Sequence, residues 1–157
     1  MGRERRPALI LLADDDDDDV LLTRRAFESA RLANPLVRVR DGEELLAYLR
    51  GEPPFDDRAA HPSPSLVLLD LNMPRKDGRE ALHEIKADPS LRAIPVVVLT
   101  TSRAEEDVVR SYRLGVNAFM QKPVLFEKLV EAASVFGRYW LEVVELPPAG
   151  PAGEKSP

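Results

Sequence analysis

Hydrophobic residues occur along this chain in short runs that are separated by longer amphipathic stretches. Five of the runs predict β-strands, at residues 8–13, 36–39, 65–70, 94–101 and 117–121. Three of them are nearly continuous rather than alternating, which is typical of strands covered by helices on both faces. The amphipathic stretches predict five helices, at residues 18–31, 43–50, 79–87, 103–114 and 125–146. This order of elements predicts a single α/β domain built on a doubly wound, five-stranded parallel sheet.

Three segments lie outside this pattern. Residues 1–7 are interpreted as an N-terminal extension, and the folded domain is expected to span residues 8–146. Residues 147–157 contain four prolines and two glycines, so we expect a disordered tail there. Residues 51–65 are rich in proline and aspartate, and they predict a long loop before the third strand.

Composition narrows the functional classes. A chain of 157 residues suits one domain with a full hydrophobic core. Its net charge of −5 argues against a general binder of nucleic acid or membrane surfaces, which would carry a basic patch. Cysteine is absent, which excludes disulfide and thiolate chemistry. The apolar run near the start is too short for a membrane span or a signal peptide, so we expect a cytoplasmic protein.

Acidic residues follow two of the predicted strands. Asp14 and Asp15 come directly after the first strand, and Asp70 ends the third. In an open parallel sheet, ligands bind at the carboxyl ends of the strands. If the two strands are neighbours, three carboxylates converge there, and like charges so close need a cation between them. The pattern therefore predicts a site for Mg²⁺, a hard cation that prefers oxygen ligands.

The same aspartate run continues through residues 16–19. We expect these four residues to lie in the loop and the first turn of the following helix, where the helix dipole favours acidic side chains and one of them can cap the helix. A solvated acidic tract with no role in the site is the alternative, and for these four residues it is the simpler interpretation.

Two further strand ends carry polar side chains. Thr100 ends the fourth strand and offers a hydroxyl group, and Lys122 follows the fifth strand and offers a fixed positive charge. Carboxylates, a divalent cation, a hydroxyl and an ammonium group around one point suit phosphoryl transfer, with an aspartate as the nucleophile. The two histidines, His61 and His83, are expected to be ordinary surface residues.

The chain resembles the receiver domain of two-component response regulators, which has a flavodoxin-like fold. The resemblance covers residues 8–146 and is carried by four segments: LILLADDD, LVLLDLNMPRKDGRE, IPVVVLTTS and GVNAFMQKPV. It implies that Asp70 is the phosphorylated aspartate. It also implies that Asp14 and Asp15 bind Mg²⁺, and that Asn72 offers its backbone carbonyl to the metal.

The resemblance further implies a switch. Thr100 would bond the phosphoryl group, Lys122 would pair with it, and Phe119 would be the switch aromatic. The family often has tyrosine at this last position, so phenylalanine here can act only by packing. A narrower resemblance links the chain to the single-domain regulators that pair with bacterial phytochrome sensor histidine kinases.

The last predicted helix, residues 125–146, carries more apolar residues than one buried face needs. We expect a homodimer through this helix, because a second copy is the simplest cover for the surplus. The alternative is a helix that curls back on its own domain. The expected interface residues are Phe136, Tyr139, Trp140 and Val144.

The leading functional hypothesis is a signalling switch rather than an enzyme. A partner histidine kinase would phosphorylate Asp70, and the chain would take part in its own phosphoryl transfer and hydrolysis. Its output would be a contact with another protein or onward phosphotransfer. The alternative is a phosphatase with an aspartate nucleophile, although the match to such enzymes is loose. A calcium-binding protein is excluded, since the spacing of a calcium-binding loop is missing.

Overall fold

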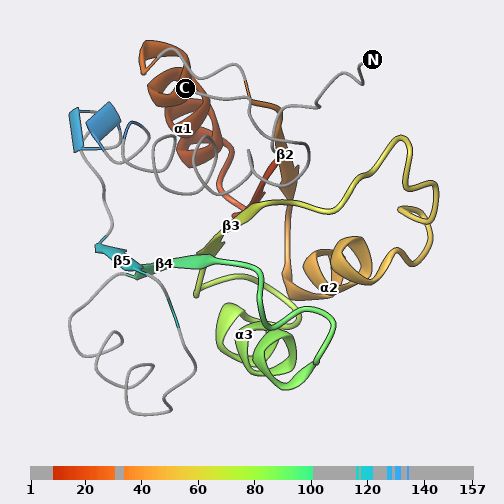
Figure 1. Cartoon of the computed structure of the whole chain (residues 1–157). Helices are drawn as coiled ribbons and strands as arrows, with labels where there is room; N and C mark the ends of the chain where they lie inside the picture. Colours follow the sequence, from red (N-terminus) through yellow and green to blue (C-terminus); the bar gives the residue numbers. More distant parts are fainter. Residues whose placement is uncertain are drawn as a thin grey trace.

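The computed structural model consists of parallel strands that alternate with helices (Figure 1). It describes residues 9–30, 34–100, 116, 118–121, 127, 128, 130, 131 and 134. In chain order the elements are β1 (Ile10–Ala13), α1 (Asp17–Ser29), β2 (Leu36–Val39), α2 (Gly42–Arg50), β3 (Leu66–Asp70), α3 (Gly78–Ala87), β4 (Val96–Thr100) and β5 (Ala118–Gln121).

The five strands form one parallel sheet in the order β2-β1-β3-β4-β5. All five predicted strands are present, and their ends differ from the predicted ends by at most two residues. The chain runs from β1 outward to β2 and then crosses back to β3 on the other side of β1. This reversal makes the carboxyl ends of β1 and β3 the switch point of a doubly wound sheet, where such folds bind ligands.

Helices cover both faces of the sheet. One core cluster joins alternate residues of β1 and β3 to α2 and α3, and a second cluster joins the intervening residues to α1. Figure 1 shows α1 on one side of the sheet and α2 and α3 on the other. The side chains on both faces of β1 and β3 are buried, which explains why these strands are continuously apolar in sequence.

Helices α1, α2 and α3 each begin with an aspartate cap. The carboxylates of Asp16, Asp41 and Asp77 accept hydrogen bonds from backbone amides in the first turns of α1, α2 and α3. These caps satisfy amides that have no partner inside the helix. The helix predicted at residues 103–114 lies outside the described residues. Of the helix predicted at residues 125–146, the described positions are helical.

The predicted loop at residues 51–65 is an ordered part of the fold. The rings of Tyr48 and Phe55 lie 5.0 Å apart between centroids, and those of Phe55 and His61 lie 5.3 Å apart. Arg58 donates to the carbonyl oxygen of Tyr48 near the end of α2, at 2.7 Å. His61 is partly buried in this aromatic group, so the prediction of an ordinary surface histidine is wrong for it. His83 is exposed, as predicted.

Candidate metal and phosphoacceptor site

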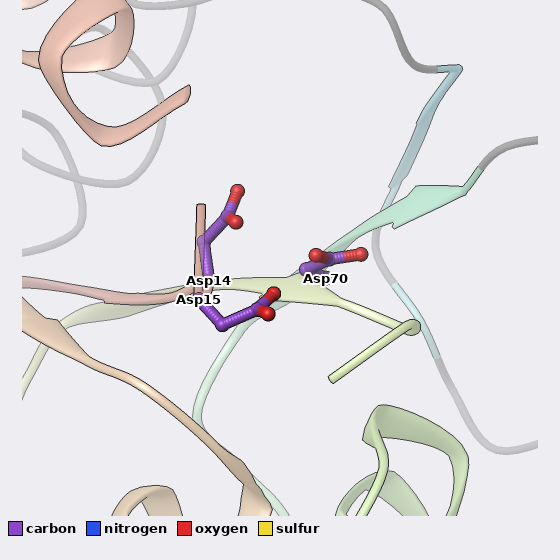
Figure 2. A group of neighbouring side chains, drawn as sticks. All are labelled: Asp14, Asp15 and Asp70. Atoms are coloured by element: carbon purple, nitrogen blue, oxygen red, sulfur yellow. The ribbon is translucent and has the colours of Figure 1, made fainter. Parts of the chain in front are cut away.

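Three carboxylates converge at the switch point of the sheet. Strands β1 and β3 are neighbours, and Ala13 pairs with Leu69, so the acidic residues that follow these two positions lie side by side. Asp14, Asp15 and Asp70 each place a carboxylate oxygen within 4.8 Å of the others (Figure 2). The predicted convergence of these three side chains is confirmed.

The three acids differ in their access to water. Asp14 and Asp70 are 1% and 2% exposed, whereas Asp15 is exposed. Water therefore screens the charge of Asp15 but little of the charge on the other two. Carboxylates this close repel one another unless a cation or a proton lies between them. An all-oxygen donor set with one open side fits Mg²⁺, which keeps several waters and takes one or two carboxylates together with phosphate oxygens.

Local turns hold the two buried carboxylates in place. Oδ1 of Asp14 accepts from the amide of Asp16 at 3.0 Å, and Oδ1 of Asp70 accepts from the amide of Asn72 at 3.0 Å. Each is an Asx-type turn, in which an aspartate side chain bonds the backbone two residues further on. The metal-binding role predicted for the carbonyl group of Asn72 stays a prediction.

The rest of the aspartate run serves the start of α1. Asp16 is the cap and accepts from the amides of Asp18 and Asp19, at 2.9 Å and 3.3 Å. Asp17 lies 2.9 Å from Arg38 and 3.6 Å from Arg40. The pKa of Asp17 lies below its usual value, mainly because the Arg38 guanidinium contacts its carboxylate. The aspartate run therefore has two parts, as the sequence predicts: Asp14 and Asp15 belong to the carboxylate group, and residues 16–19 belong to the start of α1.

A glycine at the start of α3 allows this helix to pack closely against the end of β3. Gly78 is the first residue of α3, and its amide donates to the carbonyl oxygen of Leu71 at 3.0 Å. A Cβ atom at this position would lie 2.6 Å from the Cα atom of Leu71. Only glycine allows the helix to approach β3 this closely, so the end of β3 next to Asp70 is fixed by α3.

A second contact joins the segment after Asp70 to α2. Arg75 donates to the buried carboxylate of Asp41 at 3.0 Å, and the amide of Gly42 donates to the carbonyl oxygen of Lys76 at 2.8 Å. Arg75 has a φ of 60°, a conformation that costs a residue with a side chain free energy. These bonds tie the segment that follows Asp70 to the start of α2.

The remaining predicted residues are only partly described. Thr100 ends β4, next to β3, and pairs with Gln121 of β5, so its backbone lies at the same edge of the sheet as Asp70. Phe119 lies in β5 and packs, half-buried, on the core cluster of α2 and α3. The hydroxyl group of Thr100 and the whole of Lys122 lie outside the described residues. So do the predicted interface residues Phe136, Tyr139, Trp140 and Val144.

Sequence reasoning missed Arg38. This residue lies in β2, and its guanidinium contacts both the backbone of Asp14 and the carboxylate of Asp17. The available signal was a single charged residue inside the otherwise apolar run LVRV.

The sequence matches the family model of the response regulator receiver domain over residues 10–134. The chain belongs to this family. The predicted receiver fold and its place in two-component signal transduction are thereby confirmed. No helix among the described residues is long and apolar enough to cross a membrane.

This receiver is similar to regulators of phytochrome signalling. Response regulator Rcp1 of Synechocystis sp. is 41% identical over 143 residues, which are 91% of this chain and 95% of Rcp1. The structure of the Mn²⁺-bound form of Rcp1 superposes with a TM-score of 0.75 and 41% identity, covering 90% of this chain and 100% of that chain.

Two other solved structures are equally similar. The phosphorylated cyanobacterial phytochrome response regulator RcpA is 40% identical, with a TM-score of 0.76 over 92% of this receiver and all of that chain. The bacteriophytochrome response regulator RtBRR is 44% identical, with a TM-score of 0.76 over 90% of this receiver and 85% of that chain. The predicted resemblance to phytochrome response regulators is confirmed.

Proposed function

We propose that this receiver accepts a phosphoryl group from a sensor histidine kinase on Asp70, in the presence of Mg²⁺. One observation carries the proposal: Asp70 ends a central strand at the switch point of the sheet, within 4.8 Å of the carboxylates of Asp14 and Asp15. Its turn with Asn72 fixes the carboxylate at that edge of the sheet.

The chemistry follows from what each group can do. A carboxylate oxygen of Asp70 forms a bond to phosphorus as the bond between phosphorus and the histidine nitrogen of the donor breaks. The nitrogen keeps the electron pair of that bond and takes up a proton, and the product on this chain is an acyl phosphate. Asp14, Asp15, Asp70 and the carbonyl group of Asn72 would hold Mg²⁺, which neutralises charge on the phosphoryl oxygens. Hydrolysis of the acyl phosphate by water would reset the switch.

Thr100 and Lys122 supply the other polar groups of this proposal. A phosphoryl group on Asp70 has oxygens that need hydrogen-bond donors, and a hydroxyl and an ammonium group are suited to the task. Movement of the Thr100 hydroxyl toward the phosphoryl group would leave space that Phe119 can fill. Because phenylalanine has no hydroxyl, the coupling would be steric.

The names of the relatives support a proposal for the partner. Rcp1, RcpA and RtBRR are regulators, two of them named for phytochrome signalling, so a bacteriophytochrome histidine kinase is the partner that we propose. We also propose that the protein acts in the cytoplasm and pairs with a second copy through residues 125–146. Phosphorylation of Asp70 would then act on a partner protein or pass the phosphoryl group onward.

Labelling with a small phosphodonor tests the proposal. Wild-type protein treated with acetyl phosphate and Mg²⁺ should gain one phosphoryl group, which hydroxylamine removes because it is an acyl phosphate. Asp70→Asn should abolish the labelling while circular dichroism stays unchanged. Asp18→Asn is the matched control, because it removes the same charge from an exposed position in the first turn of α1. Undiminished labelling of Asp70→Asn would refute the assignment.

A further inference from the structure

Arg38 holds the backbone of the first acidic residue of the site. Its Nε–H donates to the carbonyl oxygen of Asp14 at 2.8 Å. The amide of Asp14 in turn donates to the carbonyl oxygen of Val39, the next residue of β2, at 3.1 Å. Both polar backbone groups of Asp14 are therefore bonded to two consecutive residues of a neighbouring strand. The bond from Arg38 involves a charged donor, and such bonds are roughly twice as strong as neutral ones.

The same guanidinium also holds the start of α1. Its Nη2 is buried and lies 2.9 Å from Oδ1 of Asp17, a close ion pair without the alignment of a hydrogen bond. The Arg38 side chain is 13% exposed, and that of Asp17 is 75% exposed. Arg38 therefore links the residue that follows β1 to the first turn of α1, and the two acidic residues between its contacts, Asp15 and Asp16, lie in the turn that it spans.

This link opposes a specific force. Like charges as close as those of Asp14, Asp15 and Asp70 repel one another, and the turn that follows β1 carries two of the three carboxylates. A clamp on the carbonyl group of Asp14 keeps that turn in place before a cation arrives. Asp17 pairs with Arg38 and is not one of the three clustered carboxylates.

We propose that Arg38 is a positioning residue for the divalent-cation site, one that presets Asp14 and Asp15 for binding. The inference rests on the proposed function of that site. Partners that orient a metal ligand without touching the metal typically contribute about 10-fold or more to metal affinity. The opposite effect, repulsion between the guanidinium and the cation, is reduced because the carboxylate of Asp17 lies next to Arg38.

A charge-neutral double variant separates position from charge. Arg38→Gln combined with Asp17→Asn removes one positive and one negative charge, so the net charge is unchanged while the clamp is lost. Calorimetric titration of the full chain with Mg²⁺ should give an affinity lower than that of wild type by about 10-fold. Arg40→Gln is the control, because Arg40 lies 3.6 Å from the same Asp17 and is 59% exposed, and we expect its Mg²⁺ affinity to be close to that of wild type.

Each outcome decides the question. Wild-type Mg²⁺ affinity in the double variant would overturn the inference. Tighter Mg²⁺ binding in both single variants, Arg38→Gln and Arg40→Gln, would also overturn it, because both arginines would then act through their charge alone. If the double variant does not fold, Arg38→Lys takes its place. Lysine keeps the charge but cannot contact Asp14 and Asp17 with the same geometry, so we still expect weaker binding, and unchanged affinity would overturn the inference.

The same data separate this inference from the proposed function. A loss of unfolding free energy in the presence of EDTA, without a change in Mg²⁺ affinity, would show a purely structural role for Arg38. Wild-type protein that binds no Mg²⁺ would overturn both proposals. Wild-type protein that binds Mg²⁺ and is labelled on Asp70, with Arg38 variants of equal affinity, would overturn the role of Arg38 alone.

Discussion

Replacing Gly78 by alanine tests how closely α3 must lie against β3, the strand that ends at Asp70. The new Cβ atom would lie 2.6 Å from the Cα atom of Leu71 and 3.1 Å from the carbonyl carbon of Asp70, and closer still to the carbonyl oxygen of Asp70. All three atoms belong to the backbone, so no side chain can move aside. Either α3 moves away from the sheet or the end of β3 is displaced.

The cost can be estimated from the contacts. Overpacking in a well-packed region typically costs about 1–3 kcal/mol. If α3 moves, the bond from the Gly78 amide to Leu71 is also weakened, which costs about 1 kcal/mol more. Alanine restricts the unfolded chain more than glycine does, which offsets about 0.4–1 kcal/mol. We therefore expect the free energy of unfolding to fall by about 1–3 kcal/mol, which leaves a typical domain folded.

Urea unfolding and Mg²⁺ titration measure the two expected effects. Gly78→Ala should lower both the urea midpoint and the Mg²⁺ affinity, because the displaced backbone carries Asp70. Gly51→Ala is the matched control. Gly51 has a φ of 69°, and its new Cβ atom would lie 3.2 Å from Cδ of the Arg58 side chain, which can move. Its left-handed conformation should cost about 1–2 kcal/mol, with no change in Mg²⁺ affinity.

Unfolding of Gly78→Ala at the wild-type urea concentration, together with wild-type Mg²⁺ affinity, would refute the need for close packing of α3 on β3. Equal weakening of Mg²⁺ binding in Gly51→Ala and Gly78→Ala would refute it too, because the loss of affinity would then follow the loss of stability rather than the position of Asp70.

Three further predictions follow from the aspartate run and the last predicted helix. Asp15→Asn should lower Mg²⁺ affinity by about 10-fold or more, because even the loss of a residue that only orients a metal ligand typically costs that much. Asp18→Asn should leave the affinity unchanged. Equal losses of affinity in the two variants, measured by calorimetry, would favour a diffuse acidic tract. The pKa of Asp17 is lowered in the folded state, chiefly by Arg38. Its stabilising contribution should therefore be present above about pH 3.9 and be lost as pH falls through the folded-state pKa. NMR titration of the Asp17 carboxyl should show this low pKa, and Arg38→Gln should return it to the ordinary range. Trp140→Ala should cost a dimer about 2 kcal/mol or more and shift sedimentation toward monomer; a wild-type monomer at every concentration would exclude the proposed pairing.

The sequence predicts those parts of the site that depend on position along a strand. Asp14, Asp15 and Asp70 were found because each lies at the end of a recognisable apolar run, and parallel strands bring such ends to one edge. The strand pattern alone also predicts coverage on both faces, which the two core clusters confirm. Both the positions of the strand ends and the burial of both strand faces can be predicted from the pattern of apolar residues within each short segment.

Features that depend on pairing between distant segments were not predictable in this way. Arg38 reaches Asp14 because β2 lies beside β1 with Arg38 opposite Leu12, and nothing in the sequence near Arg38 indicates that register. The aromatic group of Tyr48, Phe55 and His61 likewise depends on how residues 51–65 fold back on the end of α2. A proline-rich composition indicates a loop but does not indicate what the loop packs against.

The six consecutive aspartates can share one fold because each neighbourhood treats its charge differently. The carboxylate of Asp16 accepts hydrogen bonds from amides at the start of α1, Asp17 pairs with Arg38, and Asp15 is exposed to water. Asp14 and Asp70 are different, because both are buried and lie together. Burial and proximity both disfavour the ionised form of a carboxylate, so positive charge beside this pair stabilises it. A cation bound there would relieve the repulsion and stabilise the folded state by mass action. Two buried carboxylates at the carboxyl ends of neighbouring strands are thus explained better by the binding of a cation than by any need of the hydrophobic core.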